Sequence, residues 1–144
     1  MNIGFSGTKL GMRYKQGEKV HDLLSYLKRN RPVGEEAVFH HGDCVGADDE
    51  AARIAWELGF TIHCHPPIKE NKRAFFPHND LVNPPFDFIV RDQHIVDDSR
   101  ILIAAPHTNY EITRSGTWTT VRYARSLKRK IFIVHPDGSV HPEN

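Results

Sequence analysis

The sequence has little of what marks secreted or membrane-spanning proteins. It contains two cysteines, Cys44 and Cys64, which is too few for the disulfide framework of a small secreted domain. No apolar run approaches the length that crosses a bilayer, and residues 1–5 do not resemble the start of a secretory signal peptide. We therefore expect a cytoplasmic chain with free thiols that makes no contact with a membrane.

An excess of charge of one sign is also missing. The chain has 19 basic and 18 acidic residues, and its formal net charge at pH 7 is +1. Binding dominated by a polyanionic backbone needs a larger basic excess, so we do not expect nucleic acid as a partner. The 144 residues, 39% hydrophobic and 26% charged, suit one globular domain with its own core, spanning residues 1–144.

Short apolar runs alternate with segments of helical spacing along the chain. Val20, Leu23, Leu24 and Leu27, for example, recur at the period of an amphipathic helix. Short, continuously apolar strands between helices are typical of a parallel sheet covered on both faces. The sequence therefore predicts an α/β fold with a mostly parallel sheet of about five strands and helices on both faces. The predicted strands are 1–5, 37–40, 60–64, 101–105 and 131–134, and the predicted helices are 18–30, 47–58, 88–96 and 117–128.

Two segments lack this pattern. Residues 66–86 carry five prolines and predict a long irregular loop, which in a compact domain is usually functional or mobile. This loop mixes basic with aromatic residues. A lid that closes over a ligand and a solvated loop anchored by Phe75 and Phe76 are therefore equally open interpretations. Residues 136–144 are polar and predict a tail.

The unusual residues of the sequence fall on loops that follow predicted strands. In a parallel sheet these loops share the carboxyl edge, where ligands bind near a topological switch point. The loops in question are residues 6–8, 40–44, 63–65 and 111–117. Their shared edge is the predicted site.

The loop that ends in Ser115-Gly116-Thr117 predicts an anion site. These small residues open the last predicted helix, whose first-turn N–H groups are free and whose dipole favours negative charge. Arg114 stands directly before them. A simple helix cap is the alternative interpretation. We expect the phosphate of a nucleotide here.

Ten histidines are many for a chain of this length, and several lie close together. His63 and His65 alternate on one predicted strand and so share a face. With His40, His41 and Cys44 they offer nitrogen and sulfur ligands that zinc accepts. No recognised spacing such as a Cys-x-x-Cys pair is present, however. We predict no metal and no other cofactor, and it stays open whether these histidines line a ligand pocket or only border a strand.

Three segments, in order along the chain, resemble the SLOG superfamily. Residues 41–48, His-Gly-Asp-Cys-Val-Gly-Ala-Asp, resemble its glycine-rich second loop, and residues 115–121 resemble its second signature, a small-residue turn that opens a helix. Residues 90–96 are similar to its arginine-bearing segment. The group includes the DNA-processing protein A family and the lonely-guy cytokinin phosphoribohydrolases. The resemblance implies a Rossmann-like domain that binds a nucleotide or nucleotide-derived small molecule, and a homo-oligomer, commonly a dimer whose partner helps wall the site.

The resemblance and the loop positions together give the predicted ligand-binding residues. The phosphate would lie at the start of the last helix, and the loops after the first two strands would face the ribose or base. Such a protein would serve as a sensor or as a sequestering sponge for immune signals such as cyclic ADP-ribose or cyclic nucleotides. The predicted ligand-binding residues are Ser6, Gly7, Thr8, His41, Gly42, Asp43, Arg91, Arg114, Ser115, Gly116 and Thr117.

Two other functions stay open. The phosphoribohydrolases carry a glutamate in the helix turn after their glycine–threonine pair, where this chain has Thr120. Cleavage of an N-glycosidic bond needs a carboxylate near the ribose, and Glu111 and Asp43 are the catalytic candidates, with Asp48 as a further substitute. Whether the chain is an enzyme therefore stays open. Binding of single-stranded nucleic acid, by similarity to DNA-processing protein A, is the third function considered.

Overall fold

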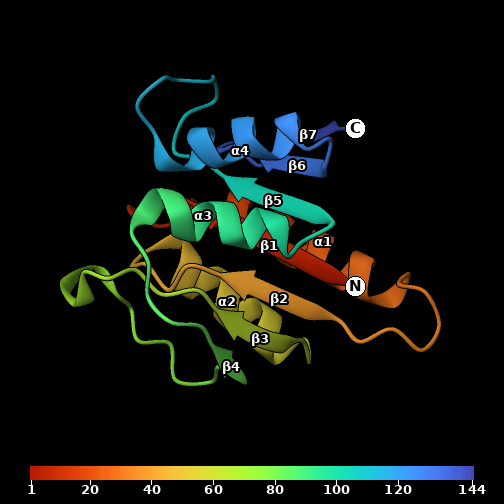
Figure 1. Cartoon of the computed structure of the whole chain (residues 1–144). Coiled ribbons are helices and arrows are strands. Elements are labelled where there is room, and N and C mark those ends of the chain that lie inside the picture. The colour runs from red at the N-terminus through yellow and green to blue at the C-terminus, as the bar shows by residue number, and fades with distance from the viewer.

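One sheet runs through the middle of the molecule. The structure, a computed structural model, describes all residues 1–144. The strands are β1 (Asn2–Gly7), β2 (Val38–His41), β3 (Thr61–Cys64), β4 (Leu81–Val82), β5 (Ile101–Ala105), β6 (Lys130–Val134) and β7 (Val140–Glu143). They lie in the order β4-β3-β2-β1-β5-β6-β7 (Figure 1). All neighbours pair in parallel except β6 and β7, which are antiparallel.

Two helices cover each face of the sheet. The alternation of β5 shows this, because Ile103 and Ala105 belong to the core beneath two helices while Leu102 and Ala104 belong to the core beneath the other two. The first pair is α1 (Tyr14–Arg29) and α2 (Ala47–Glu57), and the second pair is α3 (Phe88–Asp97) and α4 (Gly116–Ser126). The α/β fold predicted from the sequence is thus confirmed. No helix is both long and apolar enough to span a bilayer.

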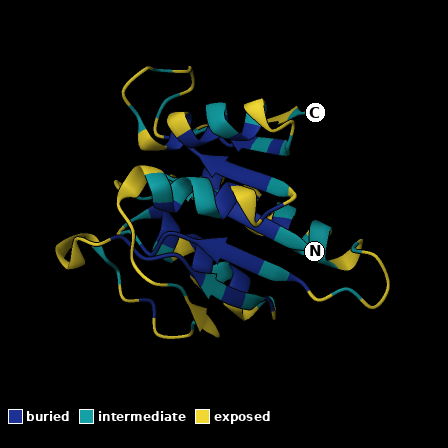
Figure 2. Cartoon of the chain, viewed as in Figure 1, coloured by how far each residue is buried: buried dark blue, intermediate teal, exposed yellow.

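The helices bury the two faces of the sheet to different extents. The core under α1 and α2 contains 16 buried residues, and the core under α3 and α4 contains 8. Figure 2 shows the central strands in the colour of buried residues, with exposed residues on the loops and the outer helix surfaces. The α3 and α4 helices pack on β1, β5 and β6. On this side β2 and β3 present His40 and His63 rather than apolar side chains.

The sheet has seven strands, so the predicted count of about five is corrected. The two additional strands lie in residues 66–86, which were predicted to form a loop, and in residues 136–144, which were predicted to form a tail. β4 has two residues between prolines and pairs with β3 through His63 and Cys64. β7 is polar and contains Pro142, which an edge strand tolerates because one side of its backbone needs no partner. β4 is too short to show a strand pattern and β7 has no apolar run, and for these reasons the sequence did not predict them.

The α1 helix starts at Tyr14, one turn before its predicted beginning at residue 18. The reason is Gln16, a polar residue that is 1% exposed and therefore breaks the expected apolar spacing. The Arg13 N–H donates to Oε1 of Gln16 (3.2 Å). Nε2 of Gln16 donates to the carbonyl groups of Pro106 and Val134, at 2.8 Å each. This amide joins the helix start to the carboxyl ends of β5 and β6.

Replacing Gln16 by methionine tests this junction. Methionine fills a similar volume but donates no hydrogen bond, so two buried carbonyl groups would lose their donor. We expect Gln16→Met to lower the free energy of unfolding by about 1–3 kcal/mol, measured by urea denaturation. The exposed neighbour variant Lys19→Met is the control and should stay within about 0.5 kcal/mol of the parent. Equal stability of the two variants would contradict the assignment.

Candidate functional site

A cavity of about 380 Å³ opens at the carboxyl edge of the sheet, between the ends of β1 and β5. From β1 the chain proceeds outward to β2 and β3, and it later returns to β5 on the other side of β1. The loops after β1 and β5 therefore diverge, and they leave a crevice at this switch point. The lining residues are Phe5, Ser6, Gly7, Thr8, Lys9, Leu10, Cys44, Asp48, Phe88, Arg91, Asp92, His107, Arg114, Ser115, Gly116 and Thr117.

The N-terminus of α4 faces this cavity with free donors. Oγ of Ser115 caps the helix by accepting from the N–H of Trp118 (3.2 Å), and the Ser115 carbonyl accepts from Thr119 (2.9 Å). The N–H groups of Gly116 and Thr117 donate to no protein atom. Two unpaired amides and the positive end of an 11-residue helix dipole thus point to an anion.

At the N-terminus of α2 one donor, the Ala47 N–H, is used by the protein itself. The Ala47 N–H donates to the carbonyl of Thr8 (2.9 Å), which also accepts from Gly11 (3.2 Å). Gly46 has φ +92°, and a Cβ at this position would collide with the carbonyl of Lys9. Only glycine allows this approach. The contact fixes the loop after β1 against α2, so that Ser6 to Leu10 form one wall of the cavity.

Several polar groups on the cavity wall have no partner. The Thr117 residue is 6% exposed, and its hydroxyl makes no hydrogen bond within the protein. The side chains of Ser6, Lys9 and Arg114 likewise make no hydrogen bond or ion pair. Gly116 has only open space where a Cβ would stand, so no protein atom requires a glycine there. These groups are available to a ligand.

Arg91 lines the cavity but is already engaged. The residue is 4% exposed. Its Nε donates to Asp92 (2.7 Å), Nη1 donates to the carbonyl groups of Gly42 and His65, and Nη2 lies 3.5 Å from Sγ of Cys44. The guanidinium therefore holds the loops after β2 and β3 in place.

Three predicted ligand residues lie outside the cavity lining. His41 is fully buried and points to the α2 side, where its Nε2 meets Oδ1 of Asn79 (2.7 Å). Asp43 is also fully buried, and its carboxylate accepts from Nε of Arg73 (2.8 Å) and from the N–H of Phe76 (3.0 Å). These two residues anchor the loop 66–86 to the sheet. The remaining residue, Gly42, lies against Arg91.

Asp48 lines the cavity and was considered only as a substitute acid. It is 6% exposed, and Oδ2 accepts from the N–H of Cys44 (3.2 Å), whereas Oδ1 has no partner. Burial raises the pKa of Asp48 to about 7. The carboxyl is therefore partly protonated at neutral pH, and it can donate as well as accept. The signal in the sequence was its place in the loop that resembles the SLOG signature.

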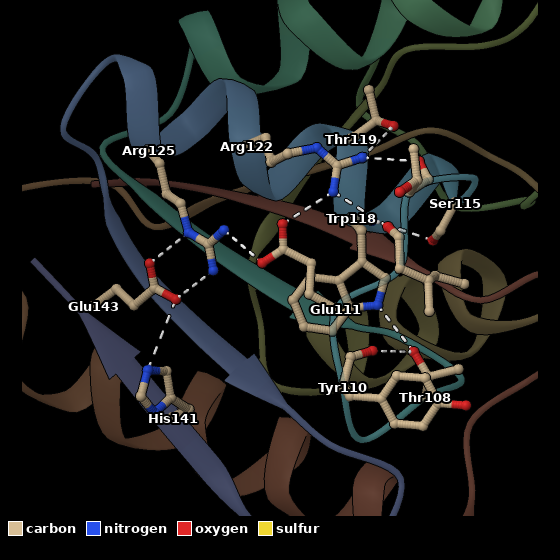
Figure 3. A network of polar contacts seen from close by, with 12 residues as sticks. Thr108, Tyr110, Glu111, Ser115, Trp118, Thr119, Arg122, Arg125, His141 and Glu143 are labelled. Atoms are coloured by element: carbon tan, nitrogen blue, oxygen red, sulfur yellow. Dashed lines mark hydrogen bonds and ion pairs between the residues drawn. The ribbon is translucent and has the colours of Figure 1, made fainter.

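Glu111 does not line the cavity but anchors the loop that precedes α4. Its two oxygens accept from Arg122 (3.0 Å) and Arg125 (2.7 Å), as Figure 3 shows. Arg122 also donates to the carbonyl groups of Ile112 and Thr113, and Arg125 pairs with Glu143 of β7. This network fixes the path of the chain into Arg114 and Ser115.

Comparison with solved structures identifies the architecture. The molybdenum cofactor binding protein from Rippkaea orientalis superimposes with TM-score 0.68 at 17% identity, covering 92% of this chain and 75% of that one. DNA processing protein A from Streptococcus pneumoniae gives TM-score 0.68 at 18% identity over 92% of this chain and 49% of that one. The chain shares the Rossmann-like α/β fold of these proteins. No protein-family model matches the sequence, and no curated protein does.

The shared fold accounts for nearly the whole chain in a further comparison. The molybdenum cofactor carrier protein from Chlamydomonas reinhardtii gives TM-score 0.63 at 19% identity, covering 91% of this chain and 74% of that one. DNA processing protein A is about twice as long as the region that matches. At these identities the likeness establishes the fold.

The close packing around Gly42 can be tested by comparison with Gly116, which has open space around it. A Cβ at Gly42 would lie 2.5 Å from Nη1 of Arg91 and 2.9 Å from Oδ2 of Asp48, whereas a Cβ at Gly116 meets nothing within 4 Å. We expect Gly42→Ala to destabilise the protein by about 1–3 kcal/mol in urea denaturation. Gly116→Ala should leave the stability unchanged or raise it by up to about 1 kcal/mol. A neutral Gly42→Ala would contradict the tight packing.

Proposed function

We propose that the protein binds a nucleotide or nucleotide-derived small molecule in the cavity at the switch point, with a phosphate on the N-terminus of α4. The observation that carries this proposal is the pair of free N–H groups at Gly116 and Thr117. They lie beside the unpaired side chains of Thr117 and Arg114. A helix N-terminus alone is a weak indication. Here the hydroxyl of Thr117, a residue that is 94% buried, and the unpaired guanidinium of Arg114 also line the cavity.

The size and lining of the cavity support a ligand of this class. About 380 Å³ lies within the range for small-molecule sites, towards its lower end. Ser6 and Asp48 also line the cavity and offer hydrogen-bonding groups that would suit ribose hydroxyls. Phe88 and Leu10 give apolar surface for a base.

The neighbours with this fold include proteins that bind a small molecule. Two of them are named as binders or carriers of the molybdenum cofactor. They support the use of this fold for holding a ligand. For this chain we propose retention of the ligand, as in a sensor or a sequestering sponge for a nucleotide signal.

Cleavage of the ligand has less support. Glu111 is held by two arginines and does not line the cavity, and Asp43 is fully buried beneath loop 66–86. The hydroxyl of Thr120, at the position of the hydrolase glutamate, donates back to the carbonyl of Gly116 (2.9 Å). Asp48 and Asp92 are the carboxyl groups that line the cavity. A phosphoribohydrolase-like reaction would have to use one of these.

Calorimetric titration with AMP and ADP-ribose tests the phosphate assignment. We expect Arg114→Gln and Thr117→Val each to weaken binding about 10-fold, the loss of one charge-assisted or neutral hydrogen bond. Arg29→Gln, an exposed arginine at the end of α1 outside the cavity, is the matched control and should bind like the parent. Binding that is unchanged in both cavity variants would refute the proposed phosphate position.

The same preparation distinguishes binding from turnover. Incubation with AMP and with NAD, followed by chromatography, should return intact nucleotide if the protein only retains its ligand. Release of free base or ribose phosphate, abolished by Asp48→Asn, would instead establish an enzyme. Native mass spectrometry of the purified protein would show any co-purified ligand and whether the chain forms a dimer.

The raised pKa of Asp48 predicts a pH dependence of binding. A phosphate monoester itself titrates near pH 6, so ADP-ribose, whose diphosphate has no such step, is the suitable probe. As the pH rises through about 7, Asp48 loses its proton and its carboxylate repels the anion. We expect the affinity to fall by several-fold to about tenfold between about pH 6 and pH 8.

Asp48→Asn is the control for this prediction. The amide keeps an acceptor for the N–H of Cys44 and carries no charge at any pH. It should flatten the profile and retain the affinity of the parent at low pH. His107 and Asp92 also line the cavity, so a profile that persists in Asp48→Asn would assign the effect to them and overturn the role given to Asp48.

A further inference from the structure

Three histidines meet on the part of the sheet that α3 and α4 leave uncovered. His40 of β2 is the cross-strand partner of His63 of β3, and His65 follows two residues later on the same face. Their ring centroids lie 4.7 Å (His40–His63), 4.5 Å (His63–His65) and 5.2 Å (His40–His65) apart. One ring nitrogen from each lies within 4.8 Å of the others. None of the three lines the cavity at the switch point.

We propose that His40, His63 and His65 bind a divalent transition-metal ion of the zinc class, with the carboxylate of Asp98 as the fourth ligand. This site is independent of the proposed nucleotide site. It also departs from the prediction of no metal, which rested on the lack of a familiar sequence spacing. The spacing is unfamiliar because the ligands come from neighbouring strands rather than from one turn or helix.

In two of the rings, the nitrogen that points away from the cluster already makes the kind of hydrogen bond that metal-bound histidines usually make. Nε2 of His40 lies 2.8 Å from Oδ1 of Asn2, and Nε2 of His63 lies 2.8 Å from Oδ1 of Asn83. A carbonyl oxygen only accepts, so both Nε2 atoms carry the proton and both Nδ1 atoms keep a lone pair. Such an outer hydrogen bond fixes the tautomer and the ring orientation of a ligand.

The inner atoms have nearly the spacing of a tetrahedral site. Nε2 of His65 lies 2.9 Å from Nδ1 of His40 and 4.0 Å from Oδ2 of Asp98. With metal–nitrogen bonds of about 2.0–2.1 Å, neighbouring ligands of a tetrahedral zinc ion lie roughly 3.3 Å apart. Shifts of well under 1 Å would therefore complete this part of the ligand set.

Metal binding changes one proton position. In the metal-free site the proton on Nε2 of His65 is donated to Nδ1 of His40, and Nδ1 of His65 accepts from Asn83 (3.0 Å). The ion replaces this shared proton, which moves to Nδ1 of His65. The carbonyl oxygen of Asn83 has two lone pairs and, after rotation of the amide, accepts from both His63 and His65.

Charge and access also suit a cation. Asp98 brings a carboxylate to the cluster, with Oδ2 4.0 Å from Nε2 of His65. Asp98 has a side chain 48% exposed, and His63 is partly exposed. An ion can therefore enter from the solvent side.

Zinc titration of the full chain without a polyhistidine tag tests the proposal. After treatment with a chelator, we expect calorimetry to show one equivalent of Zn²⁺, and Co²⁺ to give the intense visible absorption of a four-coordinate site. His63→Ala and Asp98→Asn should weaken binding at least about 10-fold. His21→Ala, an exposed histidine on α1, is the control and should bind like the parent.

Asn83 provides a second, opposite test. Asn83→Asp supplies an acceptor to both rings without rotation and should bind zinc at least as tightly as the parent, whereas Asn83→Leu should bind about 10- to 100-fold more weakly. Thermal melting without metal establishes whether each variant is folded. If His63→Ala is unfolded, zinc binding by Asp98→Asn, a substitution at an exposed side chain, tests the proposal instead. Absence of stoichiometric Zn²⁺ binding, or equal binding by Asp98→Asn and the parent, would overturn the proposal in favour of a hydrogen-bonded network that only covers the sheet.

Discussion

The buried guanidinium of Arg91 joins separate parts of the chain at the carboxyl edge of the sheet. From α3 it donates to the carbonyl groups of Gly42 and His65, which follow β2 and β3, and it reaches Sγ of Cys44. A charge this deeply buried is tolerated only where its N–H groups find partners, and Asp92 supplies the opposite charge at 2.7 Å. The cavity lining at Arg91 and Cys44 and the position of His65 directly after β3 both depend on this set of bonds.

The first turns of α2 and α4 differ by one contact and by their side chains. In α2 the Ala47 N–H donates to the carbonyl of Thr8 and so fixes the loop after β1, whereas the N–H groups of Asp48 and Asp49 have no protein partner. In α4 the cap is Ser115, and the N–H groups of Gly116 and Thr117 have no protein partner. The first turn of α2 carries the carboxyl groups of Asp48, Asp49 and Glu50, and the first turn of α4 carries none, so the positive end of the dipole is offset by acidic side chains only at α2.

The sequence predicted those features that rest on local pattern. Apolar runs predicted five of the seven strands, helical spacing predicted the four α-helices, and the small residues at 115–117 marked the turn that opens α4. What it could not predict depends on partners far along the chain. His41 ends β2 on the same face as Phe39, so its ring lies inside the core beside Asn79, and Asp43 turns inward to Arg73. Loop position alone had placed both residues at the edge.

The histidines show what strand pairing adds. The sequence predicts that His63 and His65 share a face, and the in-register pairing of β2 with β3 brings His40 to the same face. The side-chain contacts of the three rings with Asn2 and Asn83 join residues 18 to 38 positions apart, and no local pattern reveals them.

The carboxyl groups near this edge differ in their partners. Glu111 and Asp43 each pair with arginine away from the cavity, whereas Asp48 and Asp92 line it. Arg91 binds only Oδ1 of Asp92, so both Asp92 and Asp48 have an oxygen that no arginine holds. Burial raises the pKa of Asp48 to about 7, so this carboxyl can take up or release a proton near neutral pH. In its neutral form it can donate a hydrogen bond, and in its charged form it only accepts. The charge of the cavity wall at Asp48 therefore depends on pH, whereas Asp92 has the guanidinium of Arg91 2.7 Å away.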